Sequence, residues 1–393
     1  MGDVDWVARA RQVAARLAED AVRREAKGAE PVAEIEELRS AGLLALTIPT
    51  ALGGHGRDWP TAFAVVGEIA AADASIGHLL GYHYLQLWRP WLFDVPERAT
   101  ELAGQTAANG WFWAGVSNPR DQALILTDAP GGGFTCDGVK FFATGASVAD
   151  RLVVSALHPP TGGKLTFVLD AGAPGLRYLG DWDNLGQRLS ASGGVEFTSV
   201  RVDPADVLGS TGGATGAQED PRGSLISLGF QLALTQVLAG LGRGALRTGA
   251  AYTRDKSRAW PTSGVDSAVD DPHTQAAYGT LSARLDAAEL LVDRAVAAFA
   301  DADALGSGLD PVRRGELGVL VSKAKVLVSE LAVEISSRVF EVTGARATAA
   351  RVGLDRFWRN ARTLTLHDPT VYKAAEVGRH VLTGALPRPD GYS

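Results

Sequence analysis

The sequence predicts an α+β protein in three parts: an N-terminal helical domain, a central small antiparallel β domain and a C-terminal four-helix bundle. Two observations predict this order. Apolar residues recur at helical spacing towards both ends of the chain, whereas short runs rich in β-branched and aromatic residues, separated by Gly and Pro, fill the middle. We expect domains at residues 1–110, 111–215 and 216–393.

The composition is that of an ordinary folded protein. Of its 393 residues 46% are hydrophobic, which is ample for a large core, and the net charge of -7 disfavours a nucleic-acid or acidic membrane partner. The single cysteine, Cys136, cannot form an intrachain disulfide or a multi-cysteine metal site. With no signal-like segment and no run of 18 apolar residues, we expect a cytoplasmic protein without a metal.

The N-terminal part is helical in pattern. Residues 5–26 alternate apolar and charged side chains as an amphipathic helix does, and Pro31 opens a second helix. A Gly-rich turn at 53–56 interrupts the pattern. Residues 61–88 follow as one or two nearly all-apolar helices.

The middle and C-terminal parts of the sequence have different residue patterns. Predicted strands lie in the runs WFWAGVSNP, GFTCDGVKFFATGA, DRLVVSALH, KLTFVLD and GVEFTSVRV. A Gly- and Asp-rich stretch at 210–223 is typical of a linker. Periodic helical segments then occupy 224–258, 274–304, 311–343 and 369–384.

Several segments resemble motifs of the acyl-CoA dehydrogenase family, and they occur in the family's order. These are LRSAGLLALTIPTALGGHG, EIAAADASIGH, DGVKFFATGASVAD and FEVTGARATAARVGLDRFWRNAR. The resemblance covers nearly the whole chain and implies that family's fold, in which a helical domain and a β domain precede a four-helix bundle.

The catalytic base of the dehydrogenases is missing. By resemblance its usual position is held by Arg351, and a cation cannot take a proton from the substrate. The second family position falls in LALTQVLAGLG, which contains no acid. Asp355 and Glu341 remain as relocated bases, but each is expected to pair with nearby arginines on a solvated helix face. A dehydrogenase or flavin oxidase therefore remains as a disfavoured alternative.

Other segments resemble the flavin-dependent monooxygenase branch of the family. They are GYH at 81–83, TGA at 144–146, GDWDNLGQR at 180–188, RAWPTSG at 258–264 and DRFWRNARTLTLHDP at 355–369. The resemblance implies the oxygenase component of a two-component enzyme. Such an enzyme takes reduced flavin, FMN rather than FAD, from a separate NAD(P)H:flavin reductase and adds O2 at C4a of the flavin.

The same resemblance implies a homotetramer that transfers one oxygen atom, through a C4a-(hydro)peroxyflavin, to a small aromatic heterocycle of the dibenzothiophene or indole type. The sequence leaves the substrate and the oxygenated atom open. A catalytically silent paralogue of the fold remains an alternative of another class.

His367 is the foremost candidate catalytic residue. Asp368, Pro369 and Thr370 predict a helix N-cap followed by proline at the first helical position. The positive end of that helix disfavours a charged imidazole, so we expect a neutral His367 that can exchange protons. By resemblance it would manage the proton of the flavin peroxide. The alternative is a histidine that only completes the cap.

The flavin-binding residues are implied by the resemblance. Thr144 would hold the flavin and its peroxide through the hydroxyl, Phe142 would pack on the ring system, and Trp182 would form a wall of the pocket. Arg258 and Arg346 would bind the phosphate, since guanidinium groups bind phosphate bidentately, and they would come from different subunits. The alternatives are a strand threonine, a buried tryptophan and solvated arginines.

The substrate pocket is predicted from an aromatic-rich region. By resemblance His83 would line the substrate and peroxide pocket as a third catalytic residue, although a core histidine is equally compatible with the sequence. Gly115 stands where the related sequences have an asparagine donor. Aromatic residues that could form a cleft, or equally a core, are Tyr82, Trp88, Trp111 and Trp113.

One further motif is a false lead. GLGRGA at 240–245 fits the pattern G-x-G-x-x-A, but it lies inside a predicted helix and follows no strand, so it fails as a dinucleotide-binding fingerprint. Small residues that allow close helix packing explain it better.

Overall fold

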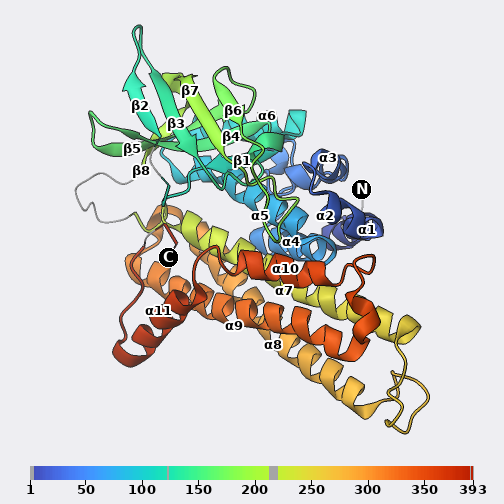
Figure 1. Cartoon of the computed structure of the whole chain (residues 1–393). Helices are drawn as coiled ribbons and strands as arrows, with labels where there is room; N and C mark the ends of the chain where they lie inside the picture. Colours follow the sequence, from blue (N-terminus) through green and yellow to red (C-terminus); the bar gives the residue numbers. More distant parts are fainter. Residues whose placement is uncertain (1–3, 122–123, 212–219, 390, 393) are drawn as a thin grey trace.

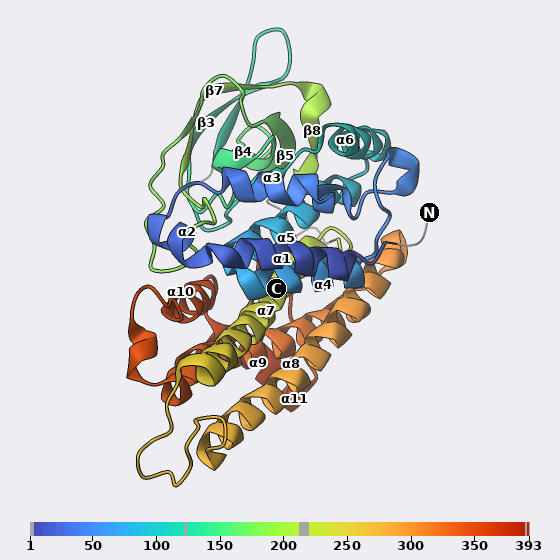
Figure 2. The ribbon, with the colours of Figure 1, turned by 90° about the vertical axis from the view of Figure 1, so that its right-hand side faces the viewer.

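The structure, a computed structural model, describes residues 4–121, 124–211, 220–389 and 391–392. It has three layers, with the sheet at one end, the N-terminal helices in the middle and the C-terminal helices at the other end (Figures 1 and 2). Residues 212–219, the centre of the predicted linker, lie outside the described part of the chain.

The middle layer is built from the N-terminal helices. They are α1 (Trp6–Glu19), α2 (Ala21–Lys27), α3 (Val32–Ser40), α4 (Trp59–Ala72), α5 (Ala74–Trp88) and α6 (Pro96–Asn109). α4 and α5 are buried on nearly every face, as expected of helices that are apolar all round. Asp73 separates them and caps α5, because its carboxylate accepts hydrogen bonds from the backbone N–H groups of Ser75 and Ile76.

The strands form one sheet around a second, smaller core. They are β1 (Trp113–Val116), β2 (Ile125–Asp128), β3 (Phe134–Lys140), β4 (Arg151–His158), β5 (Gly163–Asp170), β6 (Leu176–Tyr178), β7 (Val195–Val202) and β8 (Val207–Thr211). The order is β6-β7-β3-β2-β4-β5-β8, with β1 also pairing with β4. Most pairs are antiparallel, as predicted, but β1 and β2 both run parallel to β4, so the sheet is mixed.

The C-terminal layer contains the predicted long helices. Its elements are α7 (Leu225–Lys256), α8 (Pro272–Ala304), α9 (Pro311–Thr343), the short α10 (Asp355–Leu364) and α11 (Thr370–Thr383). α7 packs against α4 and α5 on one side and against α8 and α9 on the other. It is long and apolar enough to cross a membrane, but 78% of its most apolar stretch is buried inside the protein, as in a core helix.

Glycines let α7 approach the N-terminal helices closely. A Cβ atom on Gly240 would lie 2.4 Å from the carbonyl oxygen of Gly67, and one on Gly244 would lie 2.1 Å from that of Ala71. Both distances are too short for any side chain. The GLGRGA motif is therefore a packing motif between α7 and α4.

We predict that Gly244→Ala destabilises the protein by about 1–3 kcal/mol, because the added methyl group would overlap the backbone of α4. The matched control is Gly242→Ala in the same helix, where a Cβ would lie 3.5 Å from its nearest neighbours. That control should stabilise the helix by about 0.5–1 kcal/mol. Urea denaturation of both variants tests this, and equal midpoints would contradict it.

Candidate active site

The site is built on one face of α5. His78 and Tyr82 lie one helical turn apart, with ring centroids 4.3 Å apart and ring planes nearly perpendicular. Tyr82 also contacts Phe230 of α7 at 4.7 Å. His367 approaches from the connection between α10 and α11, close enough that its charge lowers the pKa of His78. His78 and Tyr82 therefore contact each other on α5, and His367, from a separate segment, acts on His78 through its charge.

His78 is the residue that the sequence analysis missed. Its Nδ1 lies 3.2 Å from Oε1 of Gln187, and its Nε2 is buried without a partner among the described residues. Burial, and then the nearby charge of His367, lower its pKa to about 3, so the imidazole is neutral near pH 7. The i, i+4 spacing to Tyr82 was the available signal.

His367 is bound to the neighbouring carboxylate. Its Nδ1 lies 3.2 Å from Oδ1 of Asp368, and the ring of Tyr392, near the C-terminus, lies 5.9 Å away. The predicted helix start needs correction, because α11 begins at Thr370 and no side chain caps it. Instead of capping the helix, Asp368 turns its carboxylate into the protein.

Asp368 forms a buried ion pair with Lys325 of α9. Lys325 is 1% exposed and also donates a hydrogen bond to the side-chain oxygen of Gln231. Burial by itself raises the pKa of Asp368, but the hydrogen bond from His367 and the charge of Lys325 outweigh this effect and hold the pKa well below its usual range. The carboxylate therefore stays ionised beside His367.

We predict that Asp368→Asn destabilises the protein by about 3–5 kcal/mol, since the ammonium of Lys325 would be left buried without its anion. Adding Lys325→Met to this variant should recover part of the loss. The urea midpoints of the two single variants and the double variant measure the coupling. Strictly additive losses would contradict the pairing.

The pH dependence is an independent check. A depressed carboxyl pKa stabilises the fold fully above the unfolded value of about 3.9 and less as the pH falls through the folded value. The part of the stability difference between the wild type and Asp368→Asn that comes from this carboxyl group should therefore shrink in strong acid, as the pH falls below about 3.9.

His83 does not face this region, which corrects the prediction that it lines the pocket. It is fully buried, with Nε2 2.8 Å from the carbonyl oxygen of Leu44 and with Nδ1 accepting the backbone N–H of Trp113 at 3.0 Å. Burial lowers its pKa to about 4. Both ring nitrogens are used by the backbone, so His83 ties α5 to β1.

The predicted aromatic cleft is also wrong for two tryptophans. Trp88 packs against Trp59 and Phe299, with ring centroids 5.2 and 5.7 Å away, in the core between α4, α5 and α8. Trp113 is fully buried and donates its indole N–H to Thr106 at 2.9 Å. Both are core residues, and of the predicted pocket aromatics Tyr82 alone lies beside His78.

The two remaining pocket residues serve the junction of α5 and the sheet. Trp111 lies under the guanidinium of Arg151, which is 3.6 Å from the ring centroid. Gly115 leaves room for Gln86, because a Cβ there would lie 1.9 Å from the amide nitrogen of Gln86. The missing side chain at Gly115 thus has a packing cause.

The predicted flavin hairpin presents an exposed aromatic surface. Phe142 is 62% exposed, has a left-handed backbone (φ 55°), and meets Trp182 edge-on at 6.0 Å. In the same hairpin Thr144 is buried, and its hydroxyl lies 2.9 Å from that of Ser192. The exposed ring of Phe142 and the half-buried ring of Trp182, with the hydroxyl groups of the same hairpin, suit one side of a planar tricyclic ring, so these residues fit a flavin.

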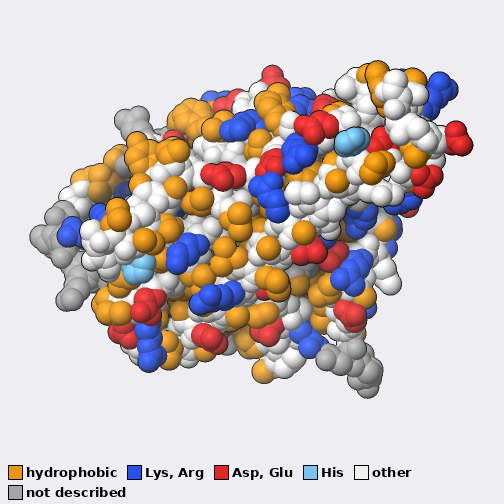
Figure 3. Space-filling view, turned by 90° about the horizontal axis from the view of Figure 1, so that it is seen from below, with side chains coloured by type: hydrophobic (Ala, Val, Ile, Leu, Met, Phe, Trp, Pro, Cys, Tyr) orange, Lys and Arg blue, Asp and Glu red, His pale blue; other side chains and the backbone are white. Residues whose placement is uncertain are grey.

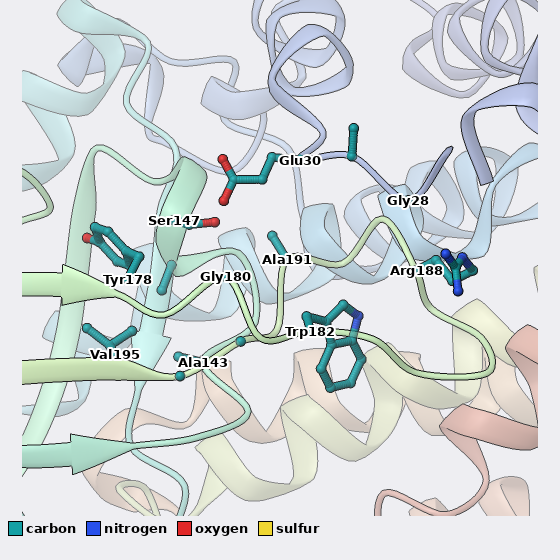
Figure 4. A pocket seen from close by; sticks show the side chains of 14 residues that line it. Gly28, Glu30, Ala143, Ser147, Tyr178, Gly180, Trp182, Arg188, Ala191 and Val195 are labelled. Atoms are coloured by element: carbon teal, nitrogen blue, oxygen red, sulfur yellow. The ribbon is translucent and has the colours of Figure 1, made fainter. Parts of the chain in front are cut away.

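An open cleft of about 480 Å³ adjoins this hairpin (Figure 4). Trp182 and Ala143 line it together with Arg188, Tyr178 and Gly28. The cleft therefore lies between the loop that carries Trp182 and the connection between α2 and α3.

Arg258 and Arg346 lie together at the far end of the bundle. Arg258 follows α7 and Arg346 follows α9, and the two helix ends are joined by a hydrogen bond from the Ser257 hydroxyl to the carbonyl of Thr343 (3.1 Å). Both arginines are exposed. This end of α7 points away from α11 and from the sheet (Figure 1).

The candidate bases of a dehydrogenase are surface residues. Asp355 pairs with Arg359 at 2.9 Å and Glu341 pairs with Arg338 at 3.3 Å. Their side chains are 52% and 63% exposed. Such carboxylates are screened by solvent and paired with arginine, so they are poorly suited to take a proton from a buried substrate.

Comparison with known proteins identifies the family. Residues 5–90 match the model described as "Acyl-CoA dehydrogenase, N-terminal domain", and residues 232–371 match "Acyl-CoA dehydrogenase, C-terminal domain". The chain is 40% identical to the dibenzothiophene monooxygenase of Mycolicibacterium goodii over 97% of this chain and 94% of that protein.

Two solved structures are similar over nearly their whole length. Methanesulfinate monooxygenase MsuC from Pseudomonas fluorescens has a TM-score of 0.94 and 40% identity, covering 98% of this chain and 99% of that chain. TdsC from Paenibacillus sp. A11-2, in complex with FMN and indole, has a TM-score of 0.95 and 37% identity, covering 99% of each chain. These matches confirm the resemblance predicted from the motifs, and the chain belongs to the acyl-CoA dehydrogenase family, in its flavin-dependent monooxygenase branch.

Proposed function

We propose that this monooxygenase is the oxygenase component of a two-component system and oxygenates a small aromatic heterocycle. A separate NAD(P)H:flavin reductase would supply the reduced FMN. Bound reduced flavin supplies two electrons to O2, so that one oxygen atom enters the substrate and the other leaves as water. The grouping of His78 and Tyr82 with His367 carries the proposal, because His367 can exchange a proton and His78 can accept a hydrogen bond where a dehydrogenase needs a carboxylate.

Different residues of this chain would bind the flavin ring system and handle the proton. Phe142 and Trp182 would bind the ring system and exclude water from it. His367, with Nδ1 on Asp368, would hold and exchange a proton at Nε2, while neutral His78 would accept a hydrogen bond at its own Nε2. Thr144 would donate a hydroxyl hydrogen bond toward the ring.

The nature of the substrate follows from the apolar lining beside these groups. Tyr82 and Phe230 present two aromatic faces, which suit a flat, apolar ring. Indole is bound in TdsC and dibenzothiophene is named for the curated relative, so either ring is a reasonable first substrate. A soluble, cytoplasmic location accords with dependence on a partner reductase.

Arg258 and Arg346 adjoin within one chain, which differs from the expectation that they come from different subunits, so both phosphate anchors would come together from a second copy of the chain. Arg346 follows Thr343 at the end of α9, whereas Lys325, which holds Asp368 beside His367, lies 18 positions earlier in the same helix. At 1.5 Å per residue this is about 27 Å, longer than one FMN molecule can span. A complete site therefore needs two chains.

An exposed apolar surface accords with such an assembly. α11 carries Val371, Tyr372, Val381 and Leu382, each at least 69% exposed. Figure 3 shows hydrophobic side chains between charged ones over much of the bundle end. Large apolar side chains gathered on one helix mark an interface, and the homotetramer predicted from the sequence would bury them.

We predict that the protein, mixed anaerobically with reduced FMN and indole and then exposed to O2, yields oxygenated indole. His367→Ala should lower the yield per flavin by about 10²–10⁴-fold, the usual contribution of a proton-transferring residue. Product analysis by mass spectrometry with ¹⁸O2 measures it. His380→Ala is the matched control, because His380 lies half-buried in the last turn of α11.

Two outcomes would contradict the proposal. One is oxidation of reduced FMN at the same rate and with the same products whether or not the protein is present. The other is reduction of tightly bound oxidised flavin by an acyl-CoA, which would favour a dehydrogenase.

We predict that Arg346→Ala and His367→Ala proteins are each nearly inactive alone but regain activity when produced together. In a mixed assembly, one site would combine the intact His367 of one chain with the intact Arg346 of another. Activity and FMN binding of the purified mixture measure it. If both residues act within one chain, no site in the mixture is intact and activity stays at the level of the variants.

A further inference from the structure

Gln187 is held unusually firmly in the loop between β6 and β7. Its side chain is buried, and its backbone adopts the left-handed conformation (φ 55°), which costs a non-glycine residue about 1–2 kcal/mol. Three groups fix it: Trp182 donates its indole N–H to the Gln187 carbonyl at 2.7 Å, Asn360 accepts the Gln187 backbone N–H, and Oε1 of Gln187 faces His78. Strained residues fixed in this way cluster at functional sites.

The preceding residue lets this loop rest on α10. A Cβ on Gly186 would lie 2.1 Å from the carbonyl oxygen of Arg359, so only glycine allows the contact. Gln187 is thereby placed between Asn360 of α10 and His78 of α5. The motifs GDWDNLGQR and FWRNAR, which are far apart in the sequence, thus meet at one point.

The hydrogen bonds that link Glu25, Asn360, Gln187 and His78 can be assigned directions from one unambiguous donor. The backbone N–H of Gln187 can only donate, so the side-chain atom of Asn360 that it meets is the carbonyl oxygen. Nδ2 of Asn360 then donates to the carboxylate of Glu25 at 3.2 Å. The same Asn360 oxygen lies 3.4 Å from Nε2 of Gln187, which leaves Oε1 of Gln187 to face the imidazole.

We propose that Gln187, oriented by Asn360, is a positioning residue that fixes His78 as the Nδ1–H tautomer. Oε1 of Gln187 accepts only, so Nδ1 of His78 must carry the proton and Nε2 must be a bare acceptor. This assignment rests on the proposed function, since it makes His78 the permanent acceptor beside the proton-exchanging His367.

The groups around His78 preserve its neutral state. Tyr82 of its own helix is half-buried, and removal from water raises the pKa of its phenol far above 10. His367 is the titratable group that approaches from the α10–α11 connection, and its charge lowers the pKa of His78. Gln187 itself is uncharged. Because the anion of Asp368 is paired with Lys325, His78 has no free carboxylate among its described contacts to draw a second proton onto the ring.

The experiment uses solid-state NMR of the flavin-free protein labelled with ¹⁵N-histidine, in which protonated and unprotonated ring nitrogens have distinct shifts. His78→Gln identifies the signals. We expect the wild type to show one tautomer with Nδ1 protonated between pH 6 and pH 8. Gln187→Met, similar in size but without the acceptor, should release the ring into a mixture of tautomers.

A second pair of variants separates positioning from folding. Gln187→Glu keeps an acceptor at Nδ1, so the tautomer should persist while the added anion raises the pKa of His78. Asn360→Leu removes the partner that orients Gln187 and should mix the tautomers as Gln187→Met does. With reduced FMN, O2 and indole, both tautomer-mixing variants should lose about 10-fold or more of the product yield, and Gln187→Glu should lose less.

Two results would overturn the inference. One is a wild-type His78 protonated at Nε2, and the other is an unchanged tautomer in Gln187→Met protein that still unfolds at the wild-type temperature. If instead the tautomers change as expected but the wild type never oxygenates indole, the positioning role stands and the proposed function fails.

Discussion

The close contact between α7 and the N-terminal helices fixes the position of nearly everything around the candidate site. Gly240 and Gly244 let the backbone of α7 touch that of α4, and Gly229 makes room for Leu85 of α5. α5 carries His78 and Tyr82. α7 carries Phe230, which contacts Tyr82, and Gln231, which accepts a hydrogen bond from Lys325. A wider gap between these helices would move the side chains of α5 away from those of α7. The polar site therefore depends on the glycines of α7.

His78 and His367 have opposite electrostatic surroundings. His78 is deeply buried, faces an uncharged amide and has a pKa lowered to about 3, whereas His367 lies at the edge of the site and contacts the anion of Asp368. Burying a carboxylate is costly unless a cation compensates it, and Lys325 provides that compensation. One imidazole is therefore held neutral while the other is kept beside a negative charge, which suits the first to accept hydrogen bonds and the second to exchange protons.

The order of domains and most helices could be predicted from the sequence because they depend on local periodicity. The family could be predicted from the sequence motifs. The residues of the site could be predicted only where a motif names them, as for His367 and Tyr82. His78 was missed because its i, i+4 spacing to Tyr82 is a weak signal by itself, and only the packing of α5 decides which histidine meets the backbone of β1. The inward turn of Asp368 was equally hidden, because its partner Lys325 lies 43 positions earlier in the chain.

The same electrostatics explain why this fold can perform oxygenation without the carboxylate base of the dehydrogenases. Asp368 reaches the site, but its bonds to Lys325 and His367 hold its pKa below the usual range, and a carboxylate so stabilised is a weak base. Asp355 and Glu341 are committed to arginines on the surface. In the proposed function, proton exchange is therefore left to His367, and Asp368 would act on the reaction only through that residue. A substitution that freed Asp368 from Lys325 would raise its basicity and would also remove the charge balance that lets it remain buried.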